Sequence, residues 1–118
     1  MSRAQVVRAL SEDLSSMRLE TRDVPAPTSG MVKVRLRAAS VNFPDILMVQ
    51  GRYQFKPELP FSPGMEGAGD VSDVGEGVEG VKEGDKVVLG ARCGCFADEI
   101  IVPAVALRPL PPGLSYTQ

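Results

Sequence analysis

The sequence predicts a mainly β fold, an all-β barrel or sandwich built from short strands. The chain has 12 glycines and 10 prolines among its 118 residues, above the average share of about 12% for the two together. The glycines at 75, 77 and 80 argue against a helix over the neighbouring valines, because each costs about 1 kcal/mol relative to alanine in a helix interior. Several short segments alternate apolar and polar residues, as strands with one buried face do. Many short strands separated by turns are typical of a barrel or sandwich.

The first half of the chain predicts three strands. We expect the first over 5–10 and the second over 17–24, with a polar turn between them and prolines after the second. The clearest strand is 32–41, where apolar and basic residues alternate, as in an antiparallel sheet with one buried and one wet face. Its basic face has two interpretations, a solvated surface or a contact with an adenosine phosphate, and the solvated surface is the commoner case. This face carries Lys33, Arg35 and Arg37.

A short helix follows over 43–50. Asn42 is a suitable N-cap. Pro44 fits the first turn, because backbone N–H groups there have no partner within the helix and proline, which lacks this group, loses no hydrogen bond. Gly51 would end the helix. The next segment, 52–63, contains three prolines and predicts an irregular surface loop.

The second half predicts further short strands. They cover residues 70–74, 86–89, 97–102 and 104–110, and a glycine-containing turn at 80–85 precedes the second of them.

Composition restricts the class of protein. The net charge of −2 shows no basic cluster, so we expect no nucleic-acid partner. No apolar run approaches the length of about 20 residues that spans a membrane, and the N-terminus lacks a signal-peptide core, so we expect a cytoplasmic protein. The absence of histidine excludes histidine catalysis and His-ligated zinc within this chain. Cys93 and Cys95, spaced Cys-x-Cys, are best interpreted as reduced thiols without a redox role.

Several motifs resemble a known family. The pattern Gly64-Met-Glu66-x-x-Gly69-x5-Gly75-x-x-Val78 resembles the signature of the medium-chain dehydrogenase/reductase superfamily. Three upstream motifs resemble its zinc-independent quinone oxidoreductase branch: Asn42-x-x-Asp45, Gly51-x-Tyr53 and Pro63-Gly64. The resemblance covers nearly the whole chain. It implies a GroES-like, partly open β-barrel with one or two short helices, the catalytic half of these reductases.

The resemblance also implies the site residues. Asn42, Asp45 and Tyr53 would be catalytic, and Asn42 and Met65 would contact the cofactor, with Asn42 and Tyr53 holding the acceptor oxygen. The residue types alone leave other roles open: a helix cap for Asn42, an internal cap or pair for Asp45, and a half-buried loop aromatic for Tyr53. For Glu66 we expect structural hydrogen bonding.

The same positions argue against zinc. In zinc-dependent relatives the position of Asn42 is a metal-binding cysteine and that of Met65 a metal-binding histidine. Zinc prefers thiolate, imidazole or carboxylate ligands, so we expect no metal.

The resemblance predicts that the chain is a fragment. Residues 1–113 would form the catalytic domain, and 114–118 would begin a missing nucleotide-binding domain. Ser115 and Gln118 have the spacing of a capping box that opens a helix. Gly75-x-Gly77-x-x-Gly80 matches the letters of a dinucleotide fingerprint but continues into a turn instead of a helix, so we reject it.

The expected function follows from this organisation. The chain would be the N-terminal catalytic-domain fragment of a zinc-independent, NADPH-dependent quinone, enone or carbonyl oxidoreductase, inactive alone and homodimeric as a parent. The alternative is a stand-alone GroES-like module that binds a partner or oligomerises without catalysis.

Overall fold

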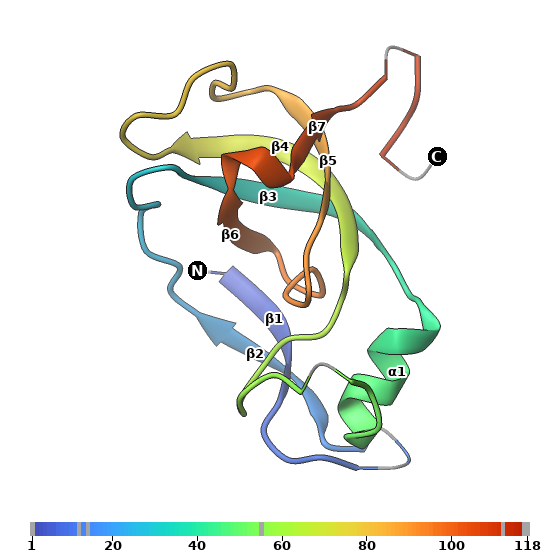
Figure 1. Cartoon of the computed structure of the whole chain (residues 1–118). Helices are drawn as coiled ribbons and strands as arrows, with labels where there is room; N and C mark the ends of the chain where they lie inside the picture. The colour runs from blue at the N-terminus through green and yellow to red at the C-terminus, as the bar shows by residue number, and fades with distance from the viewer. Residues whose placement is uncertain (1, 12, 14, 55, 112, 117–118) are drawn as a thin grey trace.

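The computed structural model describes residues 2–11, 13, 15–54, 56–111 and 113–116 of the chain. In this part, two antiparallel sheets and a single α-helix form an open arrangement that does not close into a barrel (Figure 1). The mainly β, partly open prediction is confirmed. The elements are β1 (Ser2–Val7), β2 (Met17–Arg22), β3 (Met31–Ser40), α1 (Phe43–Gln50), β4 (Glu66–Val74), β5 (Lys86–Gly90), β6 (Glu99–Pro103), a 3₁₀ turn (Ala104–Ala106) and β7 (Leu107–Pro109).

The larger sheet contains the main core. Its strand order is β6-β3-β4-β5-β7, and β1 and β2 form a separate hairpin. The predicted alternation in β3 is confirmed, because Val32 and Val34 are fully buried. Apolar side chains from all five strands pack around them, which removes their surface from water. The buried core consists of Val32, Val34, Val71, Val87, Leu89, Cys95, Ile100, Val102 and Leu107.

Acidic partners lie against the basic face of β3. Lys33 is 4.0 Å from the Glu99 carboxylate, and the Arg37 guanidinium donates to Asp70 at 2.9 Å. The Arg37–Asp70 pair is partly exposed, and such a pair contributes little to stability. The two pairs offset the positive charge of Lys33 and Arg37 that a phosphate contact would use, so the structure disfavours that contact.

A second, smaller core joins the hairpin to the helix. Val7, Met48, Val49 and Phe61 are buried together, and the backbones of Val7 and Phe61 exchange two hydrogen bonds. This cluster packs α1 and Phe61, which lies in the loop after the helix, against β1.

The helix α1 has the predicted bounds of Phe43 to Gln50. It ends at Gly51, whose φ of 77° lies in the left-handed region that glycine adopts without strain. No helix in the described residues has the length and apolar character needed to cross a bilayer.

Three strand predictions were wrong by three residues or more in their bounds. The first strand covers Ser2–Val7 instead of 5–10, because its ladder with β2 ends where Val7 pairs with Met17. The predicted strand 104–110 begins as a 3₁₀ turn, and only Leu107–Pro109 pairs with β5. The predicted strand 70–74 starts earlier, at Glu66.

The early start of β4 depends on a close backbone approach. A Cβ atom at Gly69 would collide with the carbonyl oxygen of Arg35 on β3. Glycine therefore lets the two strands pair at this point. The predicted capping box of Ser115 and Gln118 stays a prediction, because Gln118 lies outside the described residues.

Candidate functional site

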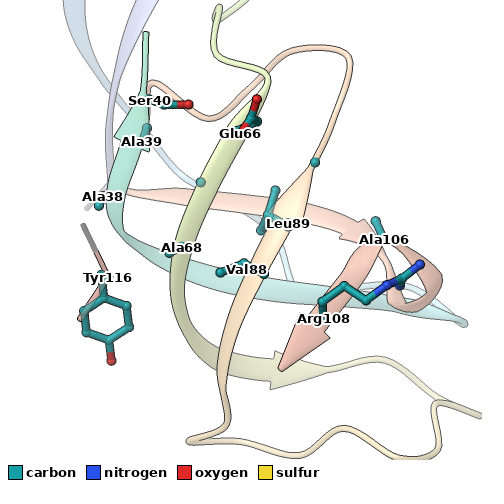
Figure 2. Close-up of a pocket in the computed structure, with 12 residues that line it drawn as sticks. Ala38, Ala39, Ser40, Glu66, Ala68, Val88, Leu89, Ala106, Arg108 and Tyr116 are labelled. Carbon is teal, nitrogen blue, oxygen red and sulfur yellow. The ribbon is translucent and has the colours of Figure 1, made fainter. Parts of the chain in front are cut away.

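A groove of about 660 Å³ lies across β3, β4, β5 and the segment leading into β7 (Figure 2). This volume is in the usual range for small-molecule sites. Small and aliphatic residues form most of its lining, and Ser40, Glu66, Arg108 and Tyr116 supply polar groups. The apolar lining consists of Ala38, Ala39, Gly67, Ala68, Val88, Leu89, Gly90 and Ala106.

One end of the groove is polar because of the strand register. Ser40, the last residue of β3, is the cross-strand partner of Glu66, the first residue of β4. Figure 2 shows their side chains at the same end of the groove. Glu66 is exposed, so its carboxylate is accessible.

Asn42 connects to this end from outside the groove lining. Its Nδ2 donates to Ser40 Oγ at 3.2 Å and, in a longer contact, to Glu66 Oε1 at 3.5 Å. A carboxylate only accepts hydrogen bonds, so the amide nitrogen must face it. The amide therefore joins the end of β3 to the start of β4.

Asp45 holds the backbone that carries Asn42. Its Oδ2 accepts the Asn42 backbone N–H at 2.8 Å, and its own N–H donates to the Asn42 carbonyl at 3.0 Å. The side chain is only 2% exposed, and its Oδ1 has no partner among the described residues. Asn42 thus occupies the N-cap position of α1, and the Asp45 carboxylate fixes it there.

Tyr53 and Met65 share a different environment. Both are partly buried and pack against the second core of Val7, Met48, Val49 and Phe61. Neither lines the groove. The structure thus groups Asn42 with Asp45, Ser40 and Glu66, and Tyr53 with Met65; the catalytic and cofactor roles of these residues stay predictions.

The two cysteines are free thiols close to this region. Cys95 is 1% exposed, and burial raises its pKa to about 12, with further contributions from the nearby charges of Asp45, Cys93 and Glu66. Burial also raises the pKa of Cys93. Since the thiolate is the reactive form, neither thiol is suited to nucleophilic chemistry at neutral pH. In the described ranges, no three Cys, Asp or Glu side chains are grouped so as to hold a metal ion.

Sequence reasoning did not identify the groove residues Ser40, Arg108 and Tyr116. Tyr116 reaches β4, where its hydroxyl donates to Asp70, and its ring lies 5.9 Å from the Lys86 ammonium. No local pattern indicates such contacts. Of these three residues, only Ser40 could have been found from the sequence, because it is a polar residue near the end of a predicted strand.

Comparison with known proteins places these features in a family. Residues 28–112 match the alcohol dehydrogenase GroES-like domain. The synaptic vesicle membrane protein VAT-1 homolog of Homo sapiens is 44% identical over 94 residues, which are 80% of this chain and 24% of that protein. The quinone oxidoreductase-like protein 2 homolog of Nematostella vectensis is 42% identical over 91 residues, 76% of this chain and 25% of that protein.

Solved structures agree with this result. The human VAT-1 homolog-like protein superposes with a TM-score of 0.92 at 30% identity, covering 98% of this chain and 38% of the other. The Escherichia coli quinone oxidoreductase complexed with NADPH gives a TM-score of 0.89 at 27% identity, covering 98% and 35%. The chain thus spans about a quarter of these curated relatives and somewhat over a third of the solved chains. On these matches, the chain belongs to the alcohol dehydrogenase GroES-like domain family of the medium-chain dehydrogenases/reductases.

Proposed function

We propose that this chain is the catalytic domain of a zinc-independent, NADPH-dependent oxidoreductase that reduces a quinone, an enone or a related carbonyl. Residues 1–113 would form the domain, and 114–118 would lead into a nucleotide-binding domain. The proposal is supported by the family match and by the likeness to a quinone oxidoreductase structure described as complexed with NADPH. A homodimeric parent and a cytoplasmic location accompany it as predictions.

The observation that carries the proposal is the amide of Asn42 at the polar end of an apolar groove. Its contact with Glu66 is long, at 3.5 Å, and therefore weak. An acceptor oxygen that enters the groove can take over this N–H when the exposed Glu66 side chain turns away from it, while Ser40 keeps the other at 3.2 Å. A donor held in place in this way stabilises negative charge that develops on the acceptor.

The remaining residues would exclude water and supply a proton. The aliphatic floor of the groove, with Ala68 and Leu89, desolvates a bound ring. Tyr53 lies outside the groove lining, and the role of its phenol in orienting a carbonyl or delivering a proton stays a prediction. Asp45 would act through the backbone of Asn42.

NADPH, when bound, supplies the hydride. This chain offers only part of a cofactor site: Ser40, Asn42 and Glu66 can hold hydroxyl or amide groups. Gly77 and Gly80 lie in the turn between β4 and β5 with positive φ and do not open a helix, so this turn lacks the helix N-terminus that binds a dinucleotide phosphate. The phosphates would be bound by further polypeptide.

The donor set at the metal position of zinc relatives does not fit zinc. Asn42 and Met65 offer an amide and a thioether, whereas zinc prefers thiolate, imidazole and carboxylate. The proposed reaction therefore uses no metal.

Steady-state kinetics of the longest polypeptide that the gene encodes would test the proposal. We expect NADPH-dependent reduction of menadione. We expect Asn42→Ala to lower kcat by about 100-fold, as for the loss of an oxyanion donor, and Glu79→Gln, an exposed turn residue, to leave it unchanged. The 118-residue chain alone should show no turnover. Full activity of Asn42→Ala would contradict the role of the amide.

The alternative of a binding module has its own signature. Sedimentation of the 118-residue chain as a stable ring or other closed oligomer, together with no NADPH oxidation by the longer polypeptide, would favour the module and reject the enzyme.

A further inference from the structure

The polar end of the groove has a definite chemical character. Glu66 presents an exposed carboxylate, which accepts hydrogen bonds and donates none. Ser40 Oγ already accepts the Asn42 amide at 3.2 Å. The end is thus rich in acceptors and carries negative charge.

The negative charge at the Ser40–Glu66 end restricts which part of a ligand can bind at that end. Negative charge that develops close to Glu66 would be repelled, because two like charges a few ångströms apart are unfavourable even near the surface. The reacting oxygen of an acceptor therefore cannot rest against the carboxylate. A hydroxyl or an amide N–H can, and its hydrogen bond would be charge-assisted.

Asn42 helps to orient the carboxylate, through a long contact of 3.5 Å. Its amide bridges Ser40 and Glu66, which are already cross-strand partners. Asp45 in turn fixes the backbone of Asn42, because its Oδ2 accepts the Asn42 N–H at 2.8 Å. A side chain held by such contacts loses less freedom when a ligand binds.

The adjacent floor accepts an apolar body. Ala38, Ala68 and Val88 line it with short side chains, so that a planar ring can lie against the sheet. Arg108 lies on the opposite side of the groove in Figure 2, with Leu89 and Val88 between it and Ser40. A ligand with one donor group and an apolar ring matches this arrangement.

We propose that the Ser40–Glu66 end of the groove binds a neutral, ring-bearing ligand through a hydroxyl or amide group that donates to Glu66, and that Asn42 is the positioning residue for this carboxylate. The inference deepens the proposed function and rests on it only for the natural ligand, such as a phenolic product or the hydroxyl or amide groups of the cofactor. Binding itself requires neither hydride transfer nor cofactor.

A matched pair of probes tests the proposal on the 118-residue chain. Para-propylphenol has a donor hydroxyl, and para-propylanisole replaces it with a methyl ether of similar shape. In NMR titrations we expect the phenol to shift the backbone amides of Ser40, Ala68 and Leu89 and to bind at least about ten-fold more tightly than the ether, as for the weaker hydrogen bonds to a charged group.

Variants at Glu66, Asn42 and Glu79 separate the hydrogen bond to the carboxylate from nonspecific apolar binding. Glu66→Leu should abolish the preference for the phenol, and Glu66→Gln, whose amide oxygen still accepts, should retain part of it. Asn42→Ala should reduce the preference without removing it, and Glu79→Leu, the matched carboxylate in a distant exposed turn, should leave it intact. Because Glu66 is exposed, its variants should keep the wild-type NMR spectrum for residues outside the groove.

The proposal would be overturned by equal binding of phenol and ether, by shifts that map outside the groove, or by a preference that survives Glu66→Leu. Absence of binding by both probes would also reject it. None of these results bears on turnover of the longer polypeptide, so the failure of this inference is distinguishable from the failure of the proposed reaction.

Discussion

The Asp45 carboxylate accepts the backbone N–H of Asn42 at 2.8 Å, while Asp45 itself is only 2% exposed. A buried acid of the helix thus determines where the half-buried Asn42 lies. The same acid leaves its second oxygen, Oδ1, without a partner among the described residues. A buried acceptor without a partner is unfavourable, so this carboxylate serves the position of Asn42 at some cost to stability.

Truncation of Asp45 tests this relationship. We expect Asp45→Ala to lower the free energy of unfolding by about 1–3 kcal/mol, because the Asn42 N–H loses its partner. Asp45→Asn should lower it less, since an amide oxygen can still accept that N–H. Urea denaturation measures both values. Equal losses for the two variants would show that the hydrogen bond is not what stabilises the cap.

The buried thiol of Cys95 predicts a pH dependence of stability. Its pKa is raised by burial from the ordinary value of 9.0 to about 12, so the folded state holds this proton more tightly than the unfolded chain does. The stabilisation is complete below pH 9 and is lost as the pH rises toward 12, at up to about 1.4 kcal/mol per pH unit.

Urea denaturation from pH 7 to about pH 10.5 would show this loss, with Cys95→Ala as the reference that lacks the thiol. The variant should be less stable at neutral pH because of its cavity, but its stability should fall less steeply with pH. Identical slopes for the two proteins would contradict the prediction.

The pairing of Tyr116 with Asp70 predicts shifted titrations. The hydrogen bond from its hydroxyl to Asp70 raises the pKa of Tyr116, and the same bond lowers the pKa of Asp70. Asp70→Asn should therefore lower the pKa of Tyr116 toward its ordinary value. Ultraviolet titration of the phenols measures this shift, with a Tyr53→Phe background to isolate the signal. An unchanged titration would mean that the two side chains do not interact in solution.

The close approach of β3 and β4 at Gly69 predicts a position-specific effect of alanine. Gly69→Ala should destabilise the fold by about 3 kcal/mol or more, at the upper end of overpacking effects, because the new Cβ collides with the Arg35 carbonyl. Gly90→Ala is the matched control on the next strand. Its Cβ would meet only the Met65 carbonyl oxygen at 3.8 Å, so we expect a change within about 0.5 kcal/mol.

Thermal or urea unfolding of both alanine variants gives the comparison. Similar stabilities of Gly69→Ala and Gly90→Ala would show that the strands can separate at this point without loss.

The sequence by itself determined the local elements. Residues 43–50 carry a cap residue before them, a proline in the first turn and a glycine after them, and the helix has these bounds. The alternation after Met31 determined which face of β3 is buried. Such signals act within a few residues, through backbone preferences and side-chain period, and therefore need no knowledge of distant segments. The family motifs likewise lie in the sequence alone.

Tertiary structure decided the rest. The first strand ends at Val7 because of its ladder with β2, although its own residues would continue to Leu10. The groove end exists because Ser40 pairs with Glu66 across two strands, a register that no local pattern specifies. Long-range pairing of this kind depends on the packing of both strands in one core. For that reason the sequence could name Asn42 as a site residue, but only the fold could join it to Ser40 and Glu66.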